Sequence, residues 1–118
     1  MQKQIVGRLG EDLAVKFLEQ KGYLVTARNI KLSYFEIDII ANIGTKTAFI
    51  EVKTKSSESQ LWQAEELLSS KKYQAFMRGV QSYCHKNKIA LQNVKLELVA
   101  ITLNSNNMAN IKHYLDII

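Results

Sequence analysis

Two short segments hold the residues whose types and spacing could perform chemistry. Glu36 and Asp38 alternate with isoleucines in the first segment, and Glu51 and Lys53 flank a valine in the second. A Gly-Thr pair at positions 44–45 lies between them, and glycine in first place suits a two-residue type II′ hairpin turn. With this pair at the centre of the turn, Asp38 faces Glu51 across the hairpin. The same register sets Glu36 opposite Lys53.

All four charged side chains then share one face of the hairpin, because the side chains of a strand alternate between faces. The apolar residues between them are predicted to point to the other face and supply core: Ile37, Ile39, Ile50 and Val52. Carboxylates that converge with a single ammonium repel one another unless a cation joins them. Hard oxygen ligands in a small group suit Mg²⁺, which leaves positions for water and substrate phosphate.

A lysine beside such a metal can orient the attacking water and offset charge in the transition state. The pattern therefore indicates metal-assisted hydrolysis of a phosphodiester. The alternative is an ordinary half-exposed hairpin whose charges face water. The Glu-x-Lys spacing alone is weak, since Glu19 and Lys21 repeat it near the end of a predicted helix. It gains weight at Glu51 because that residue lies on a predicted strand opposite Asp38.

The surrounding elements must position this hairpin. Apolar residues at helical spacing predict a helix over residues 2–21, in which Gly7, Gly10 and Ala14 leave one side bare enough to lie close against a sheet. Glu11 falls at the margin of that side. A second long helix is predicted over residues 71–87 and a short helical turn over 61–68. Strands are predicted at residues 23–27, 34–41, 47–54, 94–103 and 110–117. This order is typical of a mixed α/β sheet covered by helices.

Length and composition restrict the class of protein. With 118 residues, of which 47% are hydrophobic and 23% charged, we expect one domain over residues 1–118. No apolar run is long enough for a membrane helix, and the charged first residues do not resemble a secretory signal. The lone Cys84 cannot form an internal disulfide and is expected to be an inert core thiol. We therefore expect a cytoplasmic protein.

The positive charge is concentrated in one stretch of the chain. The formal net charge is +5, and residues 71–88 contain no acid. The basic residues of that stretch, which equal the whole net charge, are Lys71, Lys72, Arg78, Lys86 and Lys88. Such a local positive field favours a polyanion, most often a nucleic acid. The alternative is a solvated helix face.

Segments in a fixed order carry a resemblance to a known family: GRLGEDLA at 7–14, the Arg-Asn pair at 28–29, EIDIIA at 36–41, FIEVKTK at 49–55, and Lys72 ahead of Tyr83. The chain resembles the small bacterial YraN/UPF0102 family, whose members are predicted nucleases of the PD-(D/E)xK superfamily. They are similar to archaeal Holliday-junction resolvases and to restriction endonucleases. Three positions depart from the family's pattern. Phe35 stands where glycine is usual, Lys55 replaces an arginine, and Glu97 stands where aspartate is common.

The resemblance implies a restriction-endonuclease-like fold, with a mixed central sheet flanked by helices. It casts Asp38 and Glu51 as ligands of Mg²⁺ or Mn²⁺ and Lys53 as the catalytic lysine. It makes Glu11 a further catalytic acid near the metal. Candidate contacts to nucleic acid are Lys55, Lys71, Lys72 and Arg78.

Three hypotheses follow for the function. The first is a metal-dependent endonuclease acting on branched or otherwise structured DNA, and the second is a non-catalytic nucleic-acid-binding module of the same fold. The third is a protein-interaction domain whose hairpin charges are structural. The oligomeric state stays open: junction-cutting relatives are dimers, which makes a homodimer one alternative.

Overall fold

The computed structural model describes residues 3–32, 35–56, 70–104, 106, 108–115 and 117. Its elements, in chain order, are α1 (Lys3–Gln20), β1 (Leu24–Lys31), β2 (Glu36–Ile43), β3 (Lys46–Ser56), α3 (Ser70–Asn87), a 3₁₀ turn (Leu91–Asn93), β4 (Val94–Leu103) and β5 (Ala109–Tyr114). The predicted order of helix, three strands, helix and two strands is confirmed. The helical turn predicted over residues 61–68 lies outside the described residues.

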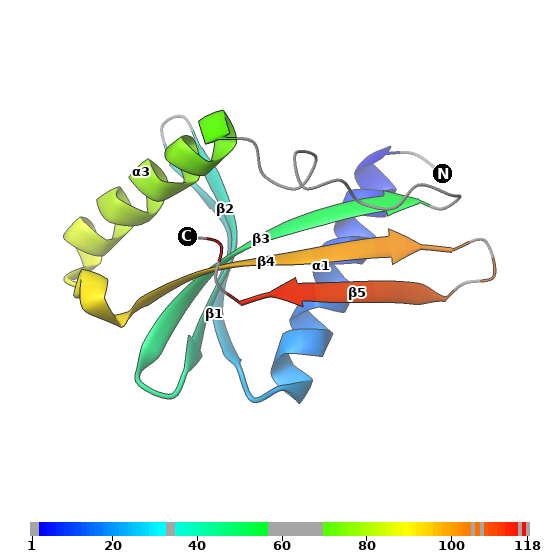
Figure 1. The fold of residues 1–118 in the computed structure, drawn as a ribbon, viewed down its shortest axis with the longest axis horizontal. Helices are drawn as coiled ribbons and strands as arrows, with labels where there is room; N and C mark the ends of the chain where they lie inside the picture. Colours follow the sequence, from blue (N-terminus) through cyan, green and yellow to red (C-terminus); the bar gives the residue numbers. More distant parts are fainter. Residues whose placement is uncertain are drawn as a thin grey trace.

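The strands form one five-stranded sheet in the order β1-β2-β3-β4-β5. Strands β3 and β4 are parallel, and the other neighbouring pairs are antiparallel. The two helices pack on opposite faces of this sheet (Figure 1). A mixed α/β sheet flanked by helices, as expected for a restriction-endonuclease-like fold, is thus confirmed. Neither α1 nor α3, the helices of the described ranges, is long and apolar enough to cross a membrane.

The β2–β3 hairpin has the register that the turn residues predict. Ile39 pairs with Ile50, and the ladder continues to Ile43 and Lys46 at the turn. Gly44 adopts a φ of 60°, in the left-handed region where a residue without Cβ is favoured. A tight turn at this place therefore fixes which residues of the two strands face each other.

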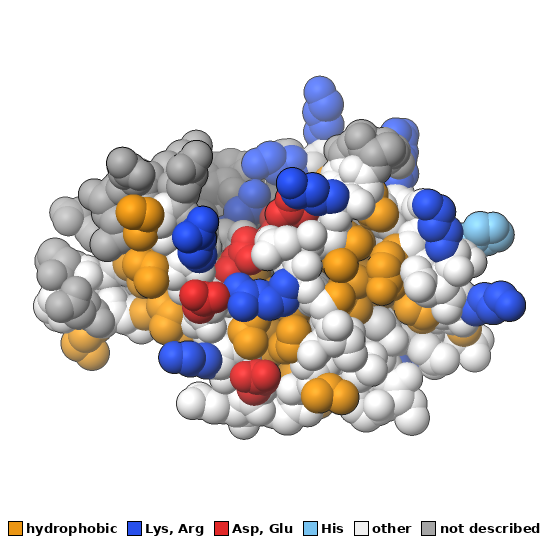
Figure 2. Space-filling view, turned by 180° about the vertical axis from the view of Figure 1, so that it is seen from behind, with side chains coloured by type: hydrophobic (Ala, Val, Ile, Leu, Met, Phe, Trp, Pro, Cys, Tyr) orange, Lys and Arg blue, Asp and Glu red, His pale blue; other side chains and the backbone are white. Residues whose placement is uncertain are grey.

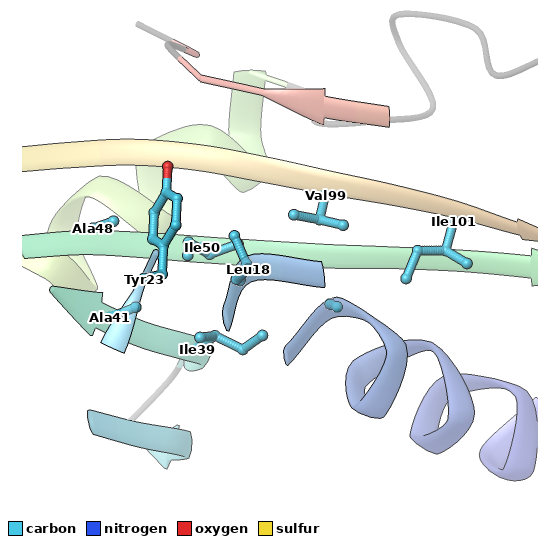
Figure 3. Packing of buried hydrophobic residues seen from close by; sticks show 9 residues of the cluster. Leu18, Tyr23, Ile39, Ala41, Ala48, Ile50, Val99 and Ile101 are labelled. Atoms are coloured by element: carbon cyan, nitrogen blue, oxygen red, sulfur yellow. The ribbon is translucent and has the colours of Figure 1, made fainter. Parts of the chain in front are cut away.

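Helix α1 covers one face of the sheet over a core of small and branched side chains (Figure 3). Ala14 and Leu18 of α1 are fully buried against Ile39 of β2 and Ile50 of β3. Gly10 lets the helix approach closely, since a Cβ there would overlap the side chain of Thr54 on β3.

Helix α3 covers the other face. Its buried Phe76, Val80 and Cys84 pack against Ile37 and Phe49 of the sheet. Cys84 is a buried free thiol, as expected. The helix begins beside the ends of β2 and β3 that carry the charged residues, so it can bring its first lysines to them.

The alternation predicted for β2 breaks at Asp38. Ile37 packs in the core under α3, whereas Ile39 packs in the core under α1, so the prediction that they share a face is wrong. The same change occurs on β1, where Ile30 packs toward α3 and Arg28 reaches α1. The residue pairs Arg28–Ile39 and Ile30–Ile37 lie on either side of this point. The regular alternation of side chains between the two faces of the sheet is therefore interrupted at the same position in both strands.

Candidate active site

A cleft of about 530 Å³ opens between the hairpin and the start of α3. Acidic and basic side chains line it together: Glu36, Asp38, Glu51, Lys53, Lys71 and Lys72, with Phe35 and Ala75. Figure 2, which views the molecule from the side opposite to Figure 1, shows acidic side chains in a row with basic ones beside them near the middle of that face. The charged residues predicted from the hairpin pattern therefore do meet in one place.

Three carboxylates form a compact group at this position. Oxygen atoms of Glu11, Glu36 and Asp38 lie within 4.8 Å of one another. Glu11 comes from α1, and its carboxylate lies near Glu36 and Asp38 at the point where the side-chain alternation of β2 is interrupted. Oxygens on opposite sides of an Mg²⁺ ion are roughly 4.2 Å apart, so small side-chain rotations would bring the three into one coordination sphere. The donor set therefore fits a hard divalent cation.

Asp38 also holds the strand ends in place. The β2–β3 ladder ends at the Ile39–Ile50 pair, and beyond it the Oδ2 atom of Asp38 accepts a 2.8 Å hydrogen bond from the backbone N–H of Val52. Asp38 and Glu51 are thus neighbours, as the register predicts. They meet through side chains, because the pairing of backbones has already ended.

Glu51 is half-buried beside Asp38. Burial, followed by the charge of Asp38 and a hydrogen bond with it, raises the pKa of Glu51 to about 9 against the opposing effect of Lys53 and Lys72. A like charge this close disfavours the ionised form of Glu51 unless a cation joins the two groups. A metal ion would take the place of the proton that Glu51 otherwise keeps.

Lys53 is half-buried at the same end of β3. Burial lowers the pKa of Lys53, and the neighbouring Lys72 lowers it further, although Glu51 and Asp38 favour the charged form. A lysine with a lowered pKa exchanges protons more readily near neutral pH, which suits a group that assists an attacking water.

Glu11 is held by residues of β1. The Arg28 Nη2 atom lies 3.7 Å from the Oε1 atom of Glu11 and makes a shorter ion pair, at 2.8 Å, with Asp12. The side chain of Asn29 also acts on Glu11, in the direction that lowers its pKa. Burial and the charge of Asp38 nevertheless raise the pKa of Glu11, because the two strand contacts do not outweigh them.

The chain matches the model of the uncharacterised protein family UPF0102 over residues 10–101. A UPF0102 protein of Dictyoglomus turgidum is 32% identical over 104 residues, which cover 88% of this chain and 87% of the relative. Relatives from Persephonella marina and Desulfitobacterium hafniense are 33% and 37% identical, and the matches cover 96% and 84% of this chain and 95% and 82% of the relatives. The chain belongs to the UPF0102 family.

The part of the chain that matches the UPF0102 model includes every residue that was predicted from the sequence to belong to the active site. Of the candidate nucleic-acid contacts, Lys71 and Lys72 line the cleft. Lys55 is half-buried farther along β3 and has interaction partners of its own, and Arg78 is exposed on α3. Neither of these two is among the residues that line the cleft.

Glu36 is the acid that sequence reasoning left out of the ligand set. It is exposed, and its carboxylate lies with those of Glu11 and Asp38. The signal was present, because Glu36 is two residues before Asp38 on the same strand. The spacing alone could not show whether Glu36 is a third metal ligand or a charged residue that faces solvent.

A second polar cluster lies on the α1 side of the UPF0102 fold and was not predicted. Glu97 is completely buried, and the Tyr23 hydroxyl hydrogen-bonds to its two oxygens at 2.9 and 3.1 Å. His113 Nε2 contacts Glu97 Oε1 at 2.7 Å, and Lys95 Nζ lies 3.2 Å from Oε2. These partners compensate the buried charge, so the cluster has a structural role.

Proposed function

We propose that this UPF0102 protein is a divalent-metal-dependent endonuclease that hydrolyses phosphodiester bonds in branched or otherwise structured DNA. The observation that carries the proposal is the convergence of two acids and one lysine, Asp38, Glu51 and Lys53, on one cleft. Glu11 adds a carboxylate beside Asp38. The resemblance of the family to PD-(D/E)xK nucleases supports the same activity.

Mg²⁺ or Mn²⁺ is the cofactor that this donor set fits. We assign Asp38, Glu51 and Glu11 as its ligands, because these ions prefer carboxylate oxygens. Glu36 lies in one group with Glu11 and Asp38, whereas Glu51 lies outside that group and lines the same cleft. When bound, such an ion supplies activation of water and neutralisation of charge on the phosphate. It would also offset the burial and the repulsion from Asp38 that together make Glu51 retain a proton.

The lysines perform the remaining tasks. Lys53, next to Glu51, orients the attacking water and donates to a phosphate oxygen as negative charge develops there. Lys71 and Lys72 line the same cleft and bind the backbone phosphates on either side of the scissile one. Lys55 and Arg78 extend these contacts away from the cleft. Cutting both strands of a branch together would require two copies, so a homodimer on DNA is part of the proposal.

The competing hypothesis is a non-catalytic module that only binds nucleic acid. Cleavage of end-labelled four-way junction, flap and linear DNA in Mg²⁺ separates the two. We expect the wild type to cut branched DNA, and Lys53→Ala and Asp38→Ala to cut at least about 100-fold more slowly. Lys112→Ala, which removes an exposed charge of β5 outside the residues that line the cleft, is the matched control and should cut normally.

Two outcomes would reject the enzyme. Wild type that binds the DNA in Mg²⁺ and leaves it intact would support the binding module. Equal cleavage by wild type and both site variants would assign the activity to a contaminant. Light scattering with and without a four-way junction tests the dimer separately.

A further inference from the structure

Asn29 has an unusual backbone conformation for its place in the fold. It lies inside β1 and has a φ of 52°, in the left-handed region. Asparagine tolerates this region better than most residues, yet regular strands do not require it. The other such non-glycine residue of the described ranges is Lys88, with a φ of 57°. Lys88 follows directly after α3, where helices commonly end in this way.

The conformation of Asn29 has a visible consequence for the site. Its neighbours on β1 point to opposite faces, Arg28 toward α1 and Ile30 toward α3. Asn29 lies between the pairs Arg28–Ile39 and Ile30–Ile37, which is the level of Asp38 on β2. The interruption of side-chain alternation in the two strands is therefore centred on Asn29 in β1 and Asp38 in β2.

Asn29 lies beside the acid group. Its side chain acts on the Glu11 carboxylate in the direction that lowers the pKa of Glu11, and oxygens of Glu11, Asp38 and Glu36 lie within 4.8 Å of one another. Arg28 is closer to Asp12 than to Glu11, at 2.8 against 3.7 Å. An amide can orient a carboxylate without neutralising its negative charge, which a cation needs. Residues that contact metal ligands, and not the metal, commonly orient those ligands in this way.

We propose that Asn29 is a positioning residue for the metal site, whose left-handed backbone and amide side chain together aim Glu11 at the cation shared with Asp38. This inference rests on the proposed function. It assigns Asn29 a role through Glu11, without contact to substrate.

Mn²⁺ affinity measured by isothermal titration calorimetry tests the role of the amide. Asn29→Gly keeps the left-handed backbone accessible and removes only the side chain. We expect it to weaken Mn²⁺ binding roughly 10- to 100-fold, the usual effect of losing a group that orients a ligand. Lys88→Gly, a glycine placed at the other left-handed position, is the matched control and should leave the affinity unchanged.

A double-mutant cycle shows whether Asn29 acts through Glu11. If it does, Asn29→Gly has little further effect once Glu11→Gln has removed the ligand. Fully additive losses, or an Asn29→Gly variant that binds Mn²⁺ as tightly as the wild type, would overturn the role of Asn29 and leave the nuclease proposal standing. Wild type that does not bind Mn²⁺, or binds it equally after Asp38→Asn, would overturn both.

Discussion

The Oδ2 atom of Asp38 accepts a 2.8 Å hydrogen bond from the backbone N–H of Val52 on the neighbouring strand. This bond joins the two strands beyond Ile39–Ile50, the last backbone pair of the ladder. Asp38 therefore has two tasks: it joins β2 to β3, and it brings its carboxylate to those of Glu11 and Glu36.

Substitutions at Asp38 should separate these tasks. Asp38→Asn keeps an oxygen that can accept from Val52, so the free energy of unfolding without metal should change by less than about 1 kcal/mol. Asp38→Ala leaves that N–H without its acceptor and should cost about 1–3 kcal/mol. Urea denaturation in a chelator measures both. Equal stability of the two variants would show that the bond to Val52 contributes nothing.

Glu51 should make the stability of the metal-free protein depend on pH. The folded protein keeps the Glu51 proton up to a pKa of about 9, whereas the unfolded chain loses it near 4.5. Between these values the folded state binds more protons, so this group's effect is a loss of stability as pH rises. Glu51→Gln should then raise the melting temperature more at pH 8 than at pH 5. Thermal unfolding in a chelator tests this, and an equal gain at both pH values would contradict the raised pKa.

Two glycines of α1 should respond in opposite directions to the same change. A Cβ at Gly10 would overlap Thr54 on β3, whereas one at Gly7 meets nothing within 4 Å. Gly10→Ala should therefore destabilise by about 1–3 kcal/mol through overpacking. Gly7→Ala should stabilise by up to about 1 kcal/mol, because alanine is the better helix former.

The Gly10 substitution should also affect the neighbouring ligand. Displacing the helix at this point would move Glu11, so Mn²⁺ affinity should fall in Gly10→Ala and stay constant in Gly7→Ala. Denaturant melts and calorimetric titrations of the pair provide the check. Two glycines with equal effects would refute the close approach of α1 to β3.

The buried Glu97 should make the protein sensitive to loss of its partners. Burial raises the pKa of Glu97, but hydrogen bonds from His113, Tyr23 and Lys95 prevail and place it below the usual range. Tyr23→Phe removes two contacts to a charged oxygen pair and should cost about 1.5–3 kcal/mol in urea unfolding at pH 7. In a Glu97→Gln background the acceptor is neutral, so the same change should cost less. An identical cost in both backgrounds would mean that the charge of Glu97 is irrelevant.

The hairpin could be predicted from sequence because its determinants are local. Glycine at position 44 selects the turn, the turn fixes the register, and the register places Asp38 beside Glu51. The helices were predictable from their apolar spacing, and Gly10 from its place on the bare side of α1. Nuclease activity, DNA binding and a dimer stay predictions.

Other features depend on single backbone angles or on distant partners. The alternation rule assumes regular strand angles, so it could not predict that Ile37 and Ile39 lie on opposite faces. Asparagine at position 29 permits a left-handed φ without requiring it. Tyr23 and Glu97 are 74 positions apart, and no spacing rule connects them.

Anomalous diffraction from crystals soaked in Mn²⁺ tests most directly whether the acids of this site hold a divalent ion. We predict one strong peak in contact with the carboxylates of Asp38, Glu51 and Glu11, and its loss in crystals of Asp38→Asn. A peak that survives this substitution, or the absence of any peak among these carboxylates at saturating Mn²⁺, would contradict the metal site and the hydrolysis that depends on it.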